Sequence, residues 1–289
     1  MRKLSIFSLL TLCALTLWGK APKNQSPEIT VMTFNIRNAT SADKENGWEY
    51  RADRVTNAVQ FYKADLVGMQ EVRPVQLEDM KERLPELGYV SVSRTGDDSP
   101  RGEHCTIWYR KSRFDVIDSG TFWLSETPDV PGSKGWDTSY PRIATWAKLK
   151  DKESGKMMLM VNTHLDHRGP NARREGAALL LKKASEIASG LPIVMTGDFN
   201  ATPESEPYSV ITDKTNPLHM TDSRTISPLV YGPAWTWHNF GRLPIEKRCF
   251  LDYLFVKNGV KVSRYGVLAE MDGKEFLSDH APALIGITL

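Results

Sequence analysis

The sequence predicts an α/β protein with two sheets, each covered on its outer side by helices. Short apolar runs rich in β-branched residues alternate with stretches of helical periodicity along most of the chain. From Tyr89 to Lys150, however, strand-like runs follow one another between Gly, Pro and Asp turns, as in an antiparallel meander. No Gly/Ser linker, repeat or composition change interrupts residues 27–289, so a single domain is expected there.

Each element is predicted from its own apolar pattern, in chain order. The first elements are a strand at 29–37, a helix at 50–63, a strand at 64–72 and a short helix at 74–87. The expected antiparallel strands are 89–94, 105–111, 114–124 and 142–151. The last elements are strands at 157–165, 192–199, 250–256, 261–269 and 282–289, a helix at 172–189 and a short helix near Glu206. Helices between strands in both halves fit two helix-covered sheets.

Residues 1–21 have the features of a secretory signal that is cleaved on export. Arg2 and Lys3 form a basic start, an apolar run follows from Leu4 to Trp18, and small residues come next. The run is shorter than the roughly 20 residues that a membrane-spanning helix needs, which argues against an uncleaved anchor. The protein is therefore expected to be secreted or periplasmic, with no stable membrane insertion after the signal is removed.

The net charge is close to zero. The chain has 37 Lys and Arg against 35 Asp and Glu, a net charge of +2, and removing residues 1–21 takes away three basic residues and leaves −1. Proteins that bind long nucleic acids usually have a basic face. The composition therefore disfavours a function that depends on binding duplex DNA.

Two cysteines remain after residue 21, Cys105 and Cys249, and both lie in strand-like segments. An exported protein permits them to form a disulfide. Separate buried thiols are at least as compatible with the pattern. The sequence leaves both states open.

Polar side chains cluster where the predicted strands end. Strands that end at one edge of a sheet bring their terminal side chains into one crevice, although the residues are far apart in sequence. Asn and Asp also form turns at strand ends, which is the simpler interpretation of any single motif. The residues concerned are Asn35, Glu71, His164, Asp166, Asp198, Asn200, Asp252, Asp279 and His280.

Taken together, these motifs resemble the endonuclease/exonuclease/phosphatase superfamily. "MTFNIR", "GMQEV", "NTHLDH", "TGDFN" and "SDHAP" occur in the family's order between Val31 and Pro282. "SETPDVPGSKGWD" and "PRIATWAKL" further resemble a group of secreted bacterial members. The resemblance implies a DNase I-like fold, a four-layer α/β/β/α sandwich in which two mixed, largely antiparallel sheets pack face to face.

The resemblance also implies hydrolysis of a phosphate ester by in-line attack of an activated water with the help of a metal ion. A negatively charged ester repels the attacking oxygen, so a hard cation held by oxygen ligands is needed. Glu71 is expected to be the main ligand, with Asn35 and Asp279 helping. Mg²⁺ suits this set because it keeps several waters and takes few carboxylates, and Mn²⁺ is the alternative.

The catalytic roles that the resemblance implies fall on two groups. Asp198 is expected to orient and deprotonate the attacking water, with Asn200 holding the phosphate or the water beside it. Asp252 and His280 are expected to form the second reactive unit, because a carboxylate behind an imidazole fixes its tautomer and raises its pKa. Whether this histidine acts as the base or as a charged stabiliser is left open.

Three further residues are expected to bind the phosphate. His164 and Arg142 would donate to the non-bridging oxygens, where charge grows in the transition state. Arg37 is a departure from nucleases of the exonuclease III type, which carry an acid two residues after the asparagine of the first motif. An extra cation beside the metal would favour one ion over two and could bind a terminal phosphate bidentately.

The leading interpretation is a secreted Mg²⁺-dependent phosphoesterase for a mono- or diester in a small, glycan-linked or lipid-linked compound. The alternatives are a nonspecific secreted endonuclease or exonuclease, a sphingomyelinase-like phospholipase, and a binding module without catalysis. The near-neutral charge disfavours the nuclease, and no apolar hairpin supports the phospholipase. The intact catalytic set disfavours the binding module. The loops expected to determine specificity are 94–103, 124–141 and 223–247.

Overall fold

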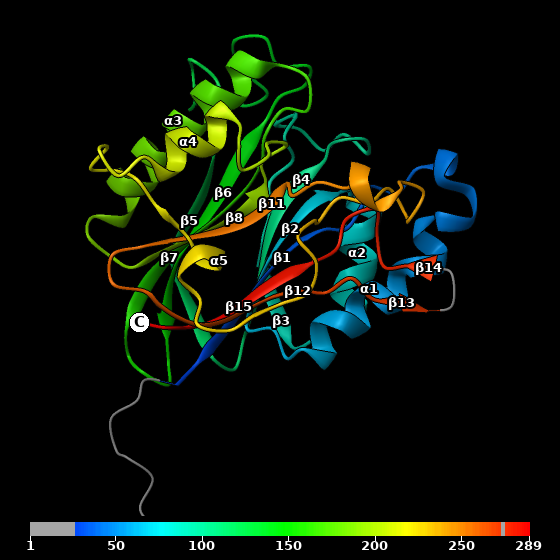
Figure 1. Ribbon diagram of the computed structural model, residues 1–289, viewed down its shortest axis with the longest axis horizontal. Coiled ribbons are helices and arrows are strands. Elements are labelled where there is room, and N and C mark those ends of the chain that lie inside the picture. The colour runs from blue at the N-terminus through cyan, green and yellow to red at the C-terminus, as the bar shows by residue number, and fades with distance from the viewer. Residues whose placement is uncertain (1–26, 273–274) are drawn as a thin grey trace, which may run out of the picture.

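Two β-sheets pack face to face, and helices cover the outer side of each sheet (Figure 1). The computed structural model describes residues 27–272 and 275–289, so the predicted signal at 1–21 lies outside the described residues. The four-layer α/β/β/α arrangement predicted from the family resemblance is confirmed.

The first sheet has seven strands in the order β10-β12-β15-β1-β2-β4-β3. Strand β1 lies near its centre, parallel to β2 and antiparallel to β15. Helices α1 (Trp48–Phe61) and α2 (Pro74–Arg83) cover its outer face and bury one hydrophobic cluster against β1 and β2. The strands are β1 (Ile29–Asn35), β2 (Leu66–Val72), β3 (Leu87–Val90), β4 (His104–Arg110), β10 (Val230–Tyr231), β12 (Lys261–Val267) and β15 (Ala283–Thr288).

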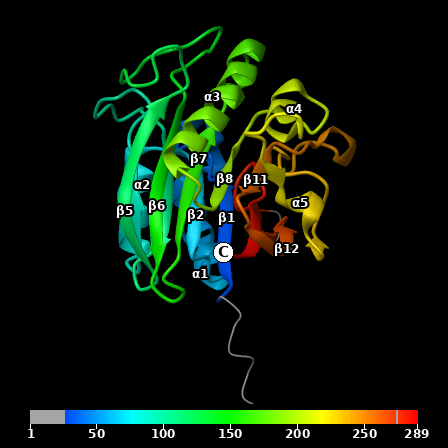
Figure 2. The ribbon, with the colours of Figure 1, turned by 90° about the vertical axis from the view of Figure 1, so that its left-hand side faces the viewer.

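The second sheet has six strands in the order β5-β6-β7-β8-β11-β9, with β7 and β8 parallel. Helices α3 (Pro170–Ala188) and α4 (Glu206–Thr212) lie on its outer side (Figure 2). The strands are β5 (Phe114–Trp123), β6 (Ile143–Asp151), β7 (Met157–His164), β8 (Ile193–Asp198), β9 (Thr221–Asp222) and β11 (Asp252–Lys257). The remaining short elements are η1 (Ser41–Asn46), α5 (Ser223–Ile226), η2 (Ile245–Lys247), β13 (Met271–Asp272) and β14 (Glu275–Phe276).

The strands expected as one meander are divided between the two sheets. Strands β3 and β4 pair in the first sheet, whereas β5 and β6 pair in the second, so the chain crosses between the sheets after β4. Helix α2 also ends at Arg83, earlier than expected, because Pro85 disfavours helical backbone in the residue before it. The shortest elements, such as β9 and α5, are too short to show a periodic pattern in the sequence.

A buried polar network joins the sheets beneath the strand ends. Asn162 on β7 donates from Nδ2 to the carbonyls of Met69 and Thr106, at 2.8 and 3.0 Å, and its Oδ1 accepts from Gln70 at 2.7 Å. Gly68 allows this close approach, since a Cβ there would lie 2.1 Å from the hydroxyl oxygen of Thr196. Buried hydrogen bonds of this kind are directional and favour one register, so the bonds of Asn162 to both neighbouring strands help to fix the strands that carry the site.

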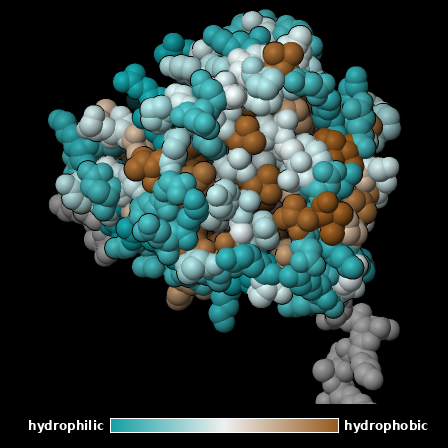
Figure 3. Space-filling model, turned by 180° about the vertical axis from the view of Figure 1, so that it is seen from behind, coloured by the Kyte–Doolittle hydropathy of each residue, from teal (hydrophilic) through white to brown (hydrophobic). Residues whose placement is uncertain are grey.

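The exposed surface carries both hydrophilic and hydrophobic side chains. Within the described ranges, no helix combines the length and apolar character needed to cross a bilayer. On the face shown in Figure 3, hydrophobic side chains gather in separate patches among hydrophilic ones. Exposed apolar side chains scattered in this way are normal for folded proteins.

Candidate active site

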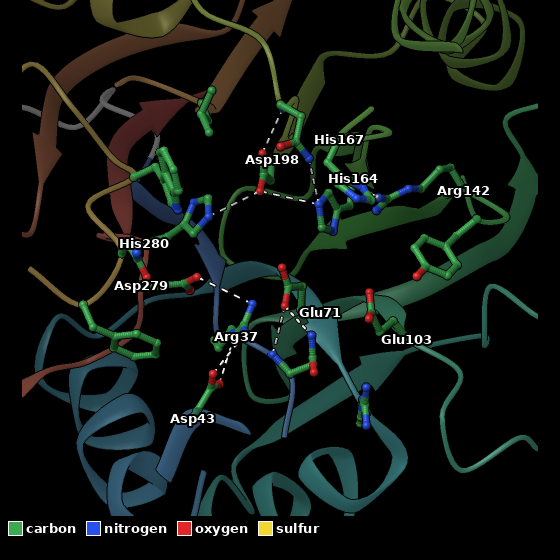
Figure 4. A pocket seen from close by; sticks show the side chains of 18 of the residues that line it. Arg37, Asp43, Glu71, Glu103, Arg142, His164, His167, Asp198, Asp279 and His280 are labelled. Atoms are coloured by element: carbon green, nitrogen blue, oxygen red, sulfur yellow. Dashed lines mark hydrogen bonds and ion pairs between the residues drawn. The ribbon is translucent and has the colours of Figure 1, made fainter. Parts of the chain in front are cut away.

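The ends of several central strands meet at a cavity of about 950 Å³ (Figure 4). Eight of the ten residues predicted from the sequence line it, which are Arg37, Glu71, Arg142, His164, Asp198, Asn200, Asp279 and His280. The other two, Asn35 and Asp252, are buried directly behind and hydrogen-bond to residues of the lining. The fold therefore brings the whole predicted set together.

Glu71 lies where the pairing of β2 with β4 shifts register between Met69 and Val72. Its φ of 62° is rare for a residue with a side chain, and such backbone strain is typical of functional sites. Asn38 donates to Oε2 twice, from its backbone nitrogen at 3.0 Å and from Nδ2 at 2.7 Å. Burial opposes ionisation, but the surrounding basic side chains, among them Arg37, and the Asn38 backbone amide hold the pKa of Glu71 below its ordinary value. Glu71 is therefore an ionised carboxylate facing the cavity.

The residues around Glu71 fit a hard cation. Asp279 lies on the neighbouring wall, with Arg37 Nη1 3.8 Å from its Oδ2. Asn35 donates from Nδ2 to Glu71 at 3.2 Å and to Asp198 at 2.9 Å, so its amide must turn to present Oδ1 to a metal. Two carboxylates and an amide are the oxygen ligands that Mg²⁺ prefers.

A second group has metal-ligand spacing, because ligand atoms of Asp198, Asp252 and His280 lie within 4.8 Å of one another. Here Asp252 Oδ2 is already bound to His280 Nδ1 at 2.8 Å. Burial lowers the pKa of His280, but the charges of Asp252 and Asp198 outweigh it and raise the pKa well above its ordinary value. A protonated imidazole repels a cation, so the Glu71 side of the cavity is the better fit for the metal.

Asp198 contacts both His280 and Asn200. His280 Nε2 lies 3.7 Å from its Oδ2, and the backbone nitrogen of Asn200 donates to Oδ1 at 2.9 Å. Burial and the Asp252 carboxylate raise the pKa of Asp198 to about 7. A carboxylate with a pKa near neutrality is suited to accept a proton from water.

His164 is held in a neutral state next to Asn200. Asn200 donates from Nδ2 both to the carbonyl of Leu165 and to His164 Nε2, each at 3.0 Å, so Nε2 is an acceptor. Burial and the charge of Arg142 hold the pKa of His164 well below its ordinary value. Donation from Nε2 to a phosphate oxygen would require Asn200 to move, and this role of His164 stays a prediction.

Comparison with known proteins identifies the family. The model of the endonuclease/exonuclease/phosphatase family matches residues 32–280. The chain belongs to this family. Its members are metal-dependent hydrolases of phosphoric esters, so the protein is an enzyme of that class.

Similar proteins include bacterial structures and eukaryotic nucleases. The chain is 42% identical to an endonuclease/exonuclease/phosphatase from Bacteroides vulgatus, covering 91% of this chain and 100% of that one, with a TM-score of 0.87. It is 38% identical to a mannosyl-6-phosphatase from Bacteroides thetaiotaomicron, with coverage of 90% and 100% and a TM-score of 0.83. It is 25% identical to the Ccr4 exoribonuclease subunit of Mycosarcoma maydis, covering 80% of this chain but only 43% of that protein.

Within this family site, Arg142 is positioned by Asp166. Arg142 Nε donates to Asp166 Oδ2 at 3.2 Å, and Nη2 bonds to His167 Nδ1 at 3.0 Å. Asp166 also accepts from Thr138, Ser139, Arg168 and Gly169, at 2.8–3.1 Å. Both charges are buried, with 5% and 0% of the side chains exposed. Asp166 is therefore a positioning residue rather than part of the cavity lining.

Asp166→Ala is expected to destabilise the fold by about 3–5 kcal/mol, because it leaves Arg142 buried without its partner. Asp118→Ala is the matched control, since Asp118 is 55% exposed and lies 3.7 Å from Lys148, and exposed pairs contribute about 0–1 kcal/mol. Urea unfolding of both variants measures the difference. Equal losses of unfolding free energy in the two variants would show that the buried Arg142–Asp166 pair stabilises the fold no more than an exposed pair does.

Arg37 is fixed at the edge of the cavity. Nε and Nη2 bind Asp43 at 2.9 and 3.0 Å, so one edge of the guanidinium is occupied and the Nη1 end remains toward Asp279. Arg51 is fully buried on α1. It donates to the carbonyls of Ile36 and Leu277 and so holds together the segments that follow β1 and β14. A phosphate would therefore meet Arg37 at its Nη1 end.

Several residues of the site were not predicted individually. Asn38 and Arg51 support the metal side through hydrogen bonds, and no family motif includes them. Arg94, Glu103 and Tyr140 line the cavity from the first two loops predicted to determine specificity. Cys105 and Cys249 are free thiols, and the second lines the cavity.

Proposed function

We propose that the protein is an exported bacterial Mg²⁺-dependent phosphatase that hydrolyses a phosphate monoester of a small or glycan-linked compound. The observation that carries this proposal is the position of two guanidinium groups, Arg37 and Arg142, on different sides of Glu71 in one cavity (Figure 4). Two such groups balance the double charge of a terminal phosphate better than the single charge of an internal diester. The 38% identity to a mannosyl-6-phosphatase supports the same substrate class.

In this proposal Glu71 and Asp279, with Asn35, would hold Mg²⁺, which neutralises charge on the phosphate and polarises its oxygens. Asp198 takes the proton of the attacking water, in keeping with its pKa of about 7. Asn200 lies beside it and orients the water or the phosphate.

The other catalytic groups act on the phosphate. His280, protonated and held by Asp252, stabilises the charge that develops on the phosphate oxygens. Arg142 donates from its cavity side, where Nη1 has no hydrogen-bond partner among the described residues. Export rests on the sequence of residues 1–21 alone.

A nuclease is the second candidate, and the similarity to Ccr4 exoribonuclease subunits favours it. The near-neutral net charge argues against it, because binding a duplex has a salt slope of about −0.9 per phosphate contacted and needs many cations. A single-stranded RNA substrate requires fewer phosphate contacts than a duplex. Within this alternative, a ribonuclease is therefore favoured over a nuclease that cleaves duplex DNA.

The test is a panel of substrates assayed with Mg²⁺: hexose 6-phosphates, phosphodiesters, oligoribonucleotides, plasmid DNA and sphingomyelin. We expect the highest kcat/KM on a small monoester. Arg37→Ala is expected to reduce it by about 10- to 100-fold, the effect of a hydrogen bond to a charged group, and to leave diester cleavage less affected.

Arg174→Ala, which removes a 40% exposed arginine on α3, is the matched control and should leave every rate unchanged. Cleavage of RNA or plasmid DNA faster than every small ester, with strong salt dependence, would make the nuclease the better assignment.

A further inference from the structure

One wall of the cavity takes no part in holding the metal or the attacking water. It is formed by Arg94, Glu103 and Tyr140, from two loops that precede β4 and β6. In Figure 4, Glu103 lies on the opposite side of Glu71 from Asp279 and His280. This wall therefore faces the part of a substrate that extends away from the phosphate.

Arg94 and Glu103 form a rigid and nearly buried ion pair. Arg94 Nη1 donates to Glu103 Oε2 at 2.6 Å, and only 12% and 13% of the two side chains are exposed. The backbone also joins the two residues, with Arg94 N donating to Glu103 O at 2.9 Å. Trp123 Nε1 donates to the Arg94 carbonyl at 2.7 Å. The pair is thus preorganised rather than a flexible surface contact.

The pair has unused hydrogen-bonding capacity toward the cavity. Glu103 Oε1, and Arg94 Nε and Nη2, make no hydrogen bond to any residue in the described part of the chain. A nearly buried ion pair is favourable only when its remaining atoms also find partners. Because both residues line the cavity, a ligand with several donors and acceptors can supply them.

Tyr140 adds an aromatic surface to this wall. The Arg94 guanidinium carbon lies 4.8 Å from its ring centroid, and the His167 ring stacks on it at 6.0 Å with an interplanar angle of 17°. The side chain is nevertheless 50% exposed. Tyr140 is therefore held in place while part of its ring stays available to a ligand.

We propose that Arg94, Glu103 and Tyr140 form a subsite for the polyhydroxylated leaving group of the ester, a sugar ring. Glu103 accepts hydrogen bonds from neighbouring hydroxyls, Arg94 donates to a ring or hydroxyl oxygen, and Tyr140 contacts the apolar C–H face of the ring. The ion pair has no net charge, so it suits a neutral alcohol better than a second phosphate. This inference rests on the proposed phosphatase function and specifies its substrate.

The test compares two leaving groups in the Mg²⁺-loaded enzyme. Glu103→Gln and Tyr140→Ala are expected to lower kcat/KM for hexose 6-phosphate by about 10- to 100-fold, mainly through KM. With 4-nitrophenyl phosphate, whose leaving group has no free hydroxyl, both variants should stay within about twofold of wild type. Glu78→Gln, on the exposed face of α2, is the control and should change neither. A disaccharide with the phosphate on its terminal sugar tests glycan-linked substrates, and hexose 6-phosphate tests free ones. A loss of kcat/KM on either of them, without a loss on 4-nitrophenyl phosphate, supports the subsite.

Two results would overturn the subsite while leaving the phosphatase intact. The first is an equal loss on both leaving groups, which would assign Glu103 to the metal or the fold. The second is no loss on any sugar phosphate in either variant. A wild-type enzyme that hydrolyses neither monoester overturns the proposed function itself, and the subsite falls with it.

Discussion

Glu71→Ala is expected to lower kcat/KM on the best phosphate ester by roughly two to three orders of magnitude, the loss typical of removing a preorganised electrostatic group. Glu71 is partly buried, ionised and held by two hydrogen bonds from Asn38, so its carboxylate is already positioned to bind a cation. The variant should need far more Mg²⁺ for half-maximal activity. Isothermal titration of the protein with Mg²⁺ or Mn²⁺ measures the loss of affinity independently of turnover.

Two comparisons make this prediction specific to the metal. Glu78→Ala removes a 67% exposed glutamate from α2 and should leave both metal affinity and rate unchanged. EDTA treatment of the wild-type enzyme should abolish activity, and added Mg²⁺ or Mn²⁺ should restore it. Full activity after EDTA, or unchanged metal affinity in the Glu71 variant, would contradict the assignment of Glu71.

The fold class could be predicted because its signals are local. Alternation of apolar runs and helical periodicity locates β1, α1 and β2 within a few residues of their bounds. Assignment of a strand to a sheet is not local, since β4 and β5 are consecutive in sequence yet belong to different sheets. Nothing in the residues between them marks the crossing, and the family resemblance rather than the local pattern predicted the four layers.

The candidate site was predictable to the extent that its residues sit in motifs at strand ends. Glu71 lies at the end of β2 in the first sheet and Asp198 at the end of β8 in the second, so the face-to-face packing of the two sheets brings them together. Asn38 and Arg51 escaped prediction because their role is to hydrogen-bond a carboxylate and backbone carbonyls that only the fold places beside them. Glu103 shows no local signal that separates it from a surface acid.

The loops were predicted as regions and not as residues. All three reach the cavity: the first contributes Arg94 and Glu103, the second Tyr140, and the third Asn239 and other residues. Loop conformation depends on contacts such as the hydrogen bond from Trp123 to Arg94, which no sequence pattern specifies. The loop residues proposed to determine specificity therefore become identifiable only once the fold has placed them around the cavity.

The Asp252–His280 pair carries the second large expected effect. Asp252 Oδ2 is 2.8 Å from His280 Nδ1, both side chains are almost fully buried, and Oδ1 of Asp252 has no hydrogen-bond partner among the described residues. The Asp252 carboxylate therefore fixes the orientation of the His280 imidazole and favours its protonated form. Residues that act as one unit lose activity non-additively, because removing either member already disables the other.

Asp252→Ala and His280→Ala are each expected to lower kcat on the order of 10³-fold, and the double variant should lose little more than His280→Ala alone. Independent residues would instead multiply to about 10⁶-fold. Asp252→Asn keeps the size of the side chain but not its charge, so a loss close to that of Asp252→Ala would show that the charge matters rather than packing. Thermal unfolding of each variant confirms that the fold persists. Fully additive losses would mean that His280 acts without Asp252, and the carboxylate would then be a structural acid beneath Asp198.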